Sequence, residues 1–226
     1  MKLMVFNGSP RTGKNNTEIM INKFLKGFSE QPGNSYEILK LNKVKFMGEA
    51  VKHFVESDTI LLAFPLYNYS MPSGVKEFIE NLEPFCGELS NKKIGFLVQY
   101  GFPEATHARP LEKYLQGLVK ELNAHYLGTI IKGGCNSLIE NIGNIEKQNK
   151  RILDGIFQIG QIFGKAGQFN KSLIANYSKP EKSTFITKII MRFLIKLINK
   201  YYWAEKLKVN GVYEQGYARP YEDKNA

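Results

Sequence analysis

A short apolar run leads into a polar, glycine-containing loop in the stretch KLMVFNGSPRTGKNNT, residues 2–17. The apolar residues 2–6 predict a buried strand, and apolar side chains at helical spacing predict a helix over residues 16–28. A strand that turns through such a loop into a helix is the first half of an α/β unit. The opening of the chain therefore favours a parallel sheet with helices packed on it.

The rest of the chain repeats this alternation. Further strands are predicted at residues 36–41, 58–64, 93–100 and 126–132, and further helices at residues 47–55, 73–82, 110–122 and 142–163. Strands alternating with helices in this way predict an open parallel α/β sheet, whose ligands bind at the carboxyl ends of the strands. We therefore expect function in the loops that follow the first, third and fourth strands.

Composition and charge narrow the classes of protein. The 226 residues are 43% hydrophobic and 23% charged, which is typical of a globular protein. The formal charge of +10 attracts anions such as phosphorylated cofactors, but no basic–aromatic motif indicates a nucleic-acid protein. Cys86 and Cys135 form no metal or iron–sulfur motif, so we predict no metal site and expect a reducing cytoplasm. Neither a signal peptide nor a membrane span is predicted.

The first loop has the groups that a phosphate needs. Ser9, Asn15, Asn16 and Thr17 offer short polar side chains, and Arg11 and Lys14 offer positive charge. The helix that follows directs its free N–H groups and its positive dipole end toward the loop. We interpret the loop as a phosphate site, and a polar turn with a capping residue is the alternative.

The same loop nearly matches the P-loop of nucleoside-triphosphate hydrolases. Gly8, Gly13 and Lys14 fit the pattern G-x-x-x-x-G-K. Asn15, however, stands where that motif needs a hydroxyl on magnesium, and the third strand ends at Pro65 without a metal-binding Asp. The loop suits a single phosphate monoester, such as that of FMN, better than a metal-bound triphosphate. Metal-dependent ATP or GTP binding would revive the P-loop hypothesis.

The second loop lies within FPLYNYSMPSGVKEFIENL, residues 64–82, and is more specific. Its two prolines fix φ on either side of an aromatic, polar segment. Such a segment can lie along a flat ring, with backbone N–H groups aimed at ring heteroatoms, and Tyr67 and Tyr69 can stack on that ring. An aromatic turn that caps the core is the alternative.

The two loops together carry a family resemblance. NGSPR…NT after the first strand, with PLYNYSMPSGVKEFIE after the third, resembles the NAD(P)H-dependent FMN reductase family of flavodoxin-like proteins, which includes quinone, nitro and azo reductases. The resemblance implies a five-stranded parallel sheet in the order 2-1-3-4-5, sandwiched by helices, with non-covalently bound FMN. Matching motifs imply that the phosphate is bound by Ser9, Arg11, Asn16 and Thr17, with Lys14 as an extra contact. They imply that the flavin ring is bordered by Pro65, Leu66, Tyr67, Asn68, Tyr69 and Met71. The other side of the flavin site would be closed by Tyr100, Gly101 and Phe102.

The implied activity is transfer of a hydride from NADPH or NADH through FMN to a flavin, quinone, nitro or azo compound. This chemistry belongs to the cofactor, so we predict no acid, base or nucleophile in the protein. His107, just past the fourth strand, is interpreted as a surface residue, and donation to a flavin carbonyl or to a substrate is the alternative. An FMN electron carrier that docks to protein partners without NAD(P)H is the second hypothesis, although such carriers are usually acidic. Relatives often build the flavin pocket between subunits, which implies a homodimer.

The C-terminal part departs from that family pattern. We expect a flavodoxin-like FMN-binding domain at residues 1–170 and a basic helical extension at residues 171–226. An apolar stripe flanked by Lys and Arg predicts an amphipathic helix over residues 184–203. We interpret this helix as packing on its own domain or on a partner subunit. Contact with an acidic membrane surface and a cover over the flavin site are the alternatives.

Overall fold

A computed structural model describes residues 1–44, 46–135, 138, 145–182, 195, 199–216 and 218. The chain forms two compact units, Met1–Lys182 and Ser183–Ala226. The amphipathic helix expected over residues 184–203 lies outside the described residues except at 195 and 199–203. Within the described part of the chain, no helix combines the length and the apolar character needed to cross a bilayer.

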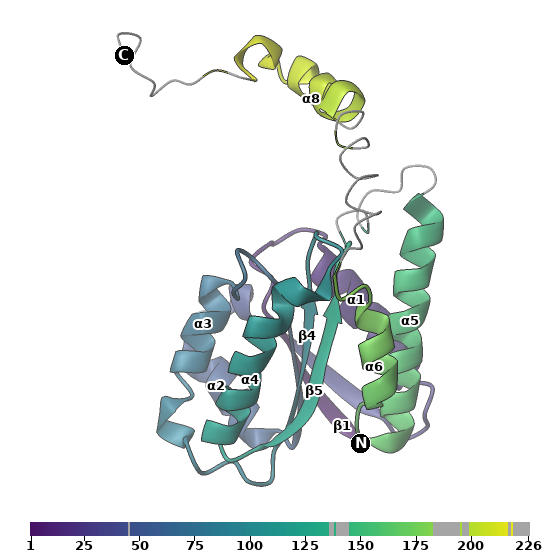
Figure 1. The fold of residues 1–226 in the computed structure, drawn as a ribbon. Helices are drawn as coiled ribbons and strands as arrows, with labels where there is room; N and C mark the ends of the chain where they lie inside the picture. The colour runs from purple at the N-terminus through teal and green to yellow at the C-terminus, as the bar shows by residue number, and fades with distance from the viewer. Residues whose placement is uncertain are drawn as a thin grey trace. The chain divides into compact units, whose positions relative to one another are not determined.

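A five-stranded parallel sheet forms the centre of the first unit (Figure 1). Its strand order is β2-β1-β3-β4-β5, which confirms the predicted order and fold. The central strand β3 is buried along its whole length, because helices cover both faces of the sheet. The strands are β1 (Lys2–Asn7), β2 (Ser35–Lys40), β3 (Thr59–Pro65), β4 (Lys93–Gln99) and β5 (His125–Lys132).

Two groups of helices cover the two faces of this sheet (Figure 1). Side chains of β1 alternate between the faces, as the pleat of a strand requires. Met4 and Phe6 pack on one side, and Leu3 and Val5 pack on the other. The first side is covered by α2 (Met47–Glu56), α3 (Ser73–Glu80) and α4 (Arg109–Glu121), and the second by α1 (Asn16–Phe28), α5 (Ile145–Ala166) and α6 (Lys171–Ser178).

The helices α1 and α5 touch through their backbones. A Cβ atom added to Gly160 of α5 would lie 2.1 Å from the carbonyl oxygen of Phe24. In the reciprocal direction, a Cβ atom on Gly27 of α1 would lie 2.2 Å from the carbonyl oxygen of Phe157. Only glycine fits at both positions, so α5 fixes the place of α1 and of the loop that precedes it.

The first unit extends past the expected boundary at residue 170, because α6 packs on the edge strand β5. Lys132 Nζ of β5 donates a hydrogen bond of 2.8 Å to the carbonyl oxygen of Tyr177 in α6. The Tyr177 hydroxyl donates in turn to the carbonyl oxygen of Ile152 in α5 at 2.9 Å. Burial raises the pKa of the Tyr177 phenol, so this hydroxyl keeps its proton and remains a donor.

Short helical turns complete the two units. In the first unit they are η1 (Leu41–Lys43), η2 (Glu83–Phe85) and η3 (Ala105–Ala108). In the second unit the described elements are η5 (Asn199–Trp203), α8 (Ala204–Val209) and η6 (Tyr213–Gln215).

Candidate cofactor-binding site

A cavity of about 570 Å³ opens at the carboxyl ends of β1, β3 and β4. It lies beside the β1–β3 junction, where the strand order of the sheet reverses and where sheets of this kind bind their ligands. Its lining comes from the three loops expected from the sequence and consists of Ser9, Arg11, Asn15, Asn16, Thr17, Pro65, Leu66, Tyr67, Asn68, Tyr69, Gln99, Tyr100, Gly101, Phe102 and His107.

Most of the predicted site residues line this cavity, with two exceptions. Lys14 is exposed and does not line the cavity, although Arg11 and Asn15 of the same loop do. Met71 packs against the hydrophobic core beneath the second loop. The lining also includes three residues outside the predicted set, namely Asn15, Gln99 and His107.

The first loop is held in place by its own side chains. The backbone N–H of Ser9 donates to Asn7 Oδ1 at 3.0 Å, and the Ser9 hydroxyl accepts from the N–H of Arg11 at 3.4 Å. Asn42 Nδ2 donates to the carbonyl oxygen of Arg11 at 3.0 Å. The Arg11 side chain is exposed, and it forms no ion pair with any residue that the structure describes. The loop thus presents a free positive charge on a fixed backbone.

Asn15 is the N-cap of α1. Its Oδ1 accepts the N–H of Glu18 at 2.9 Å, and its Nδ2 donates to the carbonyl oxygen of Gly13 at 2.9 Å. This capping role accounts for an Asn at the position where a P-loop carries its magnesium-binding hydroxyl. The N–H groups of Asn16 and Thr17 in the first turn have no partner inside the helix, and they point with the helix dipole out of its N-terminal end.

Gln99 tunes the hydroxyl of Thr17. Gln99 is the last residue of β4 and is buried, and its Nε2 donates to Thr17 Oγ1 at 3.1 Å. Because the Thr17 oxygen accepts this bond, its own proton is free to donate to a ligand. The sequence signal that could have identified Gln99 is its place as a polar residue at the end of an apolar strand.

Asn16 joins the first loop to the chain after β5. Its Nδ2 donates to the carbonyl oxygen of Cys135 at 2.7 Å, while the N–H of Cys135 donates to the carbonyl oxygen of Tyr100 at 2.9 Å. The Oδ1 of Asn16 is buried and has no hydrogen-bond partner among the described residues. One N–H of its amide donates to Cys135, and the unpaired Oδ1 offers an acceptor that suits a hydroxyl of a ligand.

The second loop forms a tight two-residue turn. Tyr67 and Ser70 exchange backbone hydrogen bonds of 2.8 and 2.9 Å around Asn68 and Tyr69, whose φ angles are +46° and +65°. A positive φ is common for Asn but is strained for an aromatic residue. The turn leaves the side chains of Tyr67 and Tyr69 45% and 61% exposed. Two large rings held at the cavity in a strained turn are typical of a binding surface.

His107 belongs to the cavity, which corrects its interpretation as a surface residue. Its ring centroid lies 5.2 Å from that of Phe102 and 5.4 Å from that of Tyr69. The turn η3 brings His107 to the cavity. No sequence pattern predicted this turn. Tyr100 lies beneath, and its hydroxyl donates to the carbonyl oxygen of Glu104 at 2.8 Å. Burial raises the pKa of the Tyr100 phenol, so that hydroxyl stays protonated.

The cavity has chemically different parts that match the parts of FMN. First-turn N–H groups, the hydroxyls of Ser9 and Thr17 and the charge of Arg11 form a donor set for a phosphate monoester. The unpaired Oδ1 of Asn16 fits a ribityl hydroxyl. The aromatic turn and the third loop offer flat apolar surface for a ring system. The residues present therefore fit FMN.

A parallel sheet in this order, with a phosphate-type loop and an aromatic loop at its switch point, defines a flavodoxin-like protein. The chain belongs to the family with the flavodoxin-like fold, which it matches over residues 1–156. This confirms the resemblance for the family and the fold. No curated protein sequence matches the chain.

Several solved structures share the fold. An NAD(P)H:quinone oxidoreductase from Methanothermobacter marburgensis is 15% identical, with a TM-score of 0.59 over 71% of this chain and 96% of that chain. An FMN-dependent NADH-azoreductase from Bacillus anthracis str. Ames Ancestor, in complex with FMN, is 14% identical, with a TM-score of 0.55 over 73% and 100% of the two chains. An NADPH-quinone reductase from P. pentosaceus is 17% identical, with a TM-score of 0.53 over 70% and 96%.

Proposed function

We propose that the protein is an FMN-dependent oxidoreductase that transfers hydride from NADPH or NADH to a small oxidised acceptor such as a flavin, a quinone, or a nitro or azo compound. The observation that carries this proposal is the pairing, in one cavity, of an anion-binding end with an aromatic wall. FMN joins one phosphate to one flat ring, which matches the two ends of the cavity.

The solved neighbours support the same reading. They are named as quinone reductases and azoreductases, and the azoreductase from Bacillus anthracis was solved with FMN. A bound FMN supplies the redox chemistry itself. The protein then needs only to bind and orient the cofactor and the two substrates.

The geometry supports a role for each of several lining residues. Thr17 and Arg11 would hold the phosphate, and the backbone of the turn between Pro65 and Tyr69 would border the ring. The exposed faces of Tyr69 and Phe102 would exclude water from the ring and offer stacking surface to a flat acceptor. The proposed hydride transfer needs no side chain as acid or base.

The test is an FMN titration of the purified protein, followed by addition of NADPH or NADH without air. We expect saturable FMN binding and bleaching of the flavin absorbance by at least one nicotinamide. Binding without bleaching would instead support the FMN electron carrier. Absence of FMN binding would overturn the proposal and reopen the triphosphate hypothesis.

Two charge-removing variants in one loop sharpen this test. Arg11→Ala removes a cation that lines the cavity, and Lys14→Ala removes one that does not. We expect Arg11→Ala to weaken FMN binding roughly tenfold or more, because a charge-assisted contact is lost. The control Lys14→Ala should change the dissociation constant less than about twofold by the same scale. Equal effects of both variants would mean that only the general charge of the loop attracts the ligand.

Three further features stay proposals. A reducing compartment, the cytoplasm, is favoured by the two cysteines, which are both free thiols, one of them exposed at Cys86. A homodimer is the assembly that we propose, and light scattering of the purified protein at two concentrations tests it. We also propose that the part of the chain after the flavodoxin-like unit packs on that unit or on a partner subunit.

A further inference from the structure

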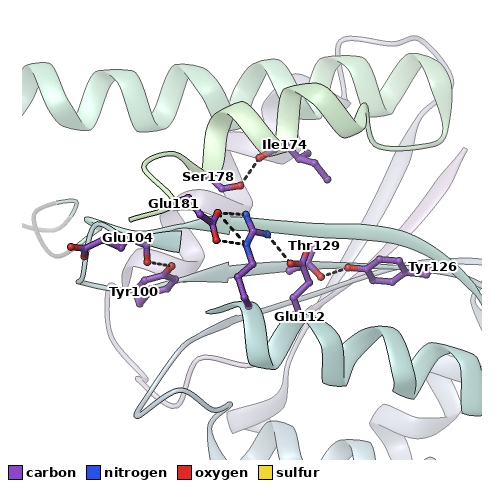
Figure 2. A network of polar contacts seen from close by, with 9 residues as sticks. Tyr100, Glu104, Glu112, Tyr126, Thr129, Ile174, Ser178 and Glu181 are labelled. Atoms are coloured by element: carbon purple, nitrogen blue, oxygen red, sulfur yellow. Dashed lines mark hydrogen bonds and ion pairs between the residues drawn. The ribbon is translucent and has the colours of Figure 1, made fainter. Parts of the chain in front are cut away.

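A second polar network lies beside the cavity, at the beginning of α4. Figure 2 shows the carboxylates of Glu181 and Glu112 converging on one guanidinium group, which belongs to Arg109. Arg109 Nε and Nη2 donate to the two carboxylate oxygens of Glu181 at 3.0 and 2.7 Å, and Nη1 donates to Glu112 at 2.7 Å. Glu181 follows α6, so this two-pronged contact joins α4 to the end of the first unit.

Backbone hydrogen bonds run alongside this contact. The N–H of Ala105 donates to the carbonyl oxygen of Pro180 at 2.8 Å, and the N–H of Thr106 donates to that of Glu181 at 3.1 Å. Ala105 is fully buried, so its N–H would lose its partner without the Pro180 carbonyl. We call Arg109, Glu181 and these two backbone bonds the η3 clamp.

The clamp acts on the turn that carries His107. Ala105 and Thr106 are the first residues of η3, and His107 is the next. His107 lies with Phe102 and Tyr69 at the edge of the cavity. If η3 moved outward, the histidine ring would leave both aromatic neighbours.

One half of the clamp lies outside the part of the chain that matches the family. The family match ends at residue 156, whereas the clamp uses Pro180 and Glu181. The side chains of Arg109 and Glu181 are 33% and 51% exposed, so a simple ion pair would contribute little. The two-pronged geometry and the paired backbone bonds are what give the contact directional strength.

We propose that Arg109 and Glu181 are positioning residues: they hold η3 so that His107 stays between Tyr69 and Phe102 at the mouth of the flavin site. The part of the proposal that concerns acceptor binding rests on the proposed function. The part that concerns the position of His107 does not, because it can be tested on the protein without FMN.

The first experiment measures the position of His107 by proton NMR. The chain has three histidines, and the signals that disappear in His107→Asn belong to His107. The nearby rings of Tyr69 and Phe102 shift the imidazole proton signals of His107. Glu181→Gln should move these signals toward the values of an exposed histidine. The control Glu37→Gln breaks the ion pair of 2.8 Å between Lys2 and Glu37, which joins β1 to β2 at their amino-terminal ends, and should leave the His107 signals in place. Unchanged His107 signals in folded Glu181→Gln would overturn the proposal.

A conservative variant protects the test against simple misfolding. Arg109→Lys keeps the positive charge but loses the two-pronged contact. We expect its His107 signals to lie between those of the wild type and Glu181→Gln. Signals equal to those of the wild type would show that charge alone suffices, and the clamp geometry would then be refuted.

The second experiment uses the FMN-loaded enzyme and a quinone acceptor. Glu181→Gln should raise the KM for the quinone roughly tenfold or less, with little change in the FMN dissociation constant, because η3 does not hold the phosphate. Glu37→Gln should keep both wild-type values. A shifted His107 signal with an unchanged KM would refute the role in acceptor binding. Failure of the wild type to bind FMN would refute the proposed function instead, and the NMR result would still decide the clamp.

Discussion

The close contact between α1 and α5 makes a sharp prediction for Gly160→Ala. The new Cβ atom would lie 2.1 Å from the carbonyl oxygen of Phe24, whereas ordinary van der Waals contact begins at 3.4 Å. Two backbones must therefore separate by about 1 Å, because no flexible side chain can give way.

The expected magnitude follows from two opposing effects. Overpacking of this kind typically costs about 1–3 kcal/mol, while Ala in a helix gains roughly 1 kcal/mol over Gly. We expect the free energy of unfolding of Gly160→Ala to fall by up to about 2 kcal/mol, which lowers Tm by up to several degrees.

The matched control is Gly117→Ala in α4. A Cβ atom on Gly117 would meet nothing within 4 Å, so only the helix propensity changes and stability should rise by roughly 0.5–1 kcal/mol. Urea unfolding followed by circular dichroism measures both variants. The two changes should have opposite signs.

The reciprocal glycine adds a coupling test. Gly27→Ala creates the same kind of contact, with a Cβ atom 2.2 Å from the carbonyl oxygen of Phe157. Once one methyl group has pushed the helices apart, the second should cost less, so the double variant should lose less than the sum of the single variants. A Gly160→Ala protein as stable as Gly117→Ala would refute the backbone contact.

Two further predictions concern the cavity and the clamp. Tyr69→Gly relieves the strain of a positive φ and should raise the free energy of unfolding by up to about 1 kcal/mol, while it weakens FMN or acceptor binding. Denaturant unfolding measures the first effect and flavin fluorescence the second. A loss of stability would contradict the strain. The hydrogen bond from Arg109, together with its charge, lowers the pKa of Glu181 below its ordinary 4.5. The stability from this carboxylate is therefore fully present above pH 4.5 and is lost as the pH falls through the lowered pKa. The stability difference between the wild type and Glu181→Gln should shrink only below pH 4.5, and a difference that persists at pH 3 would argue against an ionic contact.

The fold was predictable because local and global signals agree in this chain. The strands β1, β3 and β4 are mostly apolar runs, and residues 59–65 form a strand that is apolar enough for the centre of a sheet. The carboxyl-end position of the site then follows from parallel topology alone. The loops of the site were visible because their motifs are contiguous in sequence.

Side-chain directions were less predictable. Lys14 carries a positive charge in the predicted phosphate loop, yet its side chain is exposed to solvent. Asn16 stays a predicted phosphate residue, and the structure adds a bond from its amide to the carbonyl oxygen of Cys135, which is distant in sequence. His107 reaches the cavity through η3, whose backbone N–H groups donate to Pro180 and Glu181. For these two residues the contacting partner lies far along the chain, where no local pattern can reveal it.

The hydrogen bonds that join Asn16 to Cys135 and Cys135 to Tyr100 place little constraint on the side chain of residue 135. They link the first loop to the third through a peptide N–H and a peptide carbonyl, and the side chain of residue 135 takes no part in either bond. Evolution can therefore replace this residue by any other that fits the same buried space, and the two loops keep their spacing. Of the residues that form this link only Asn16 contributes a side chain, so the link constrains the residue type at position 16 and leaves position 135 free to vary.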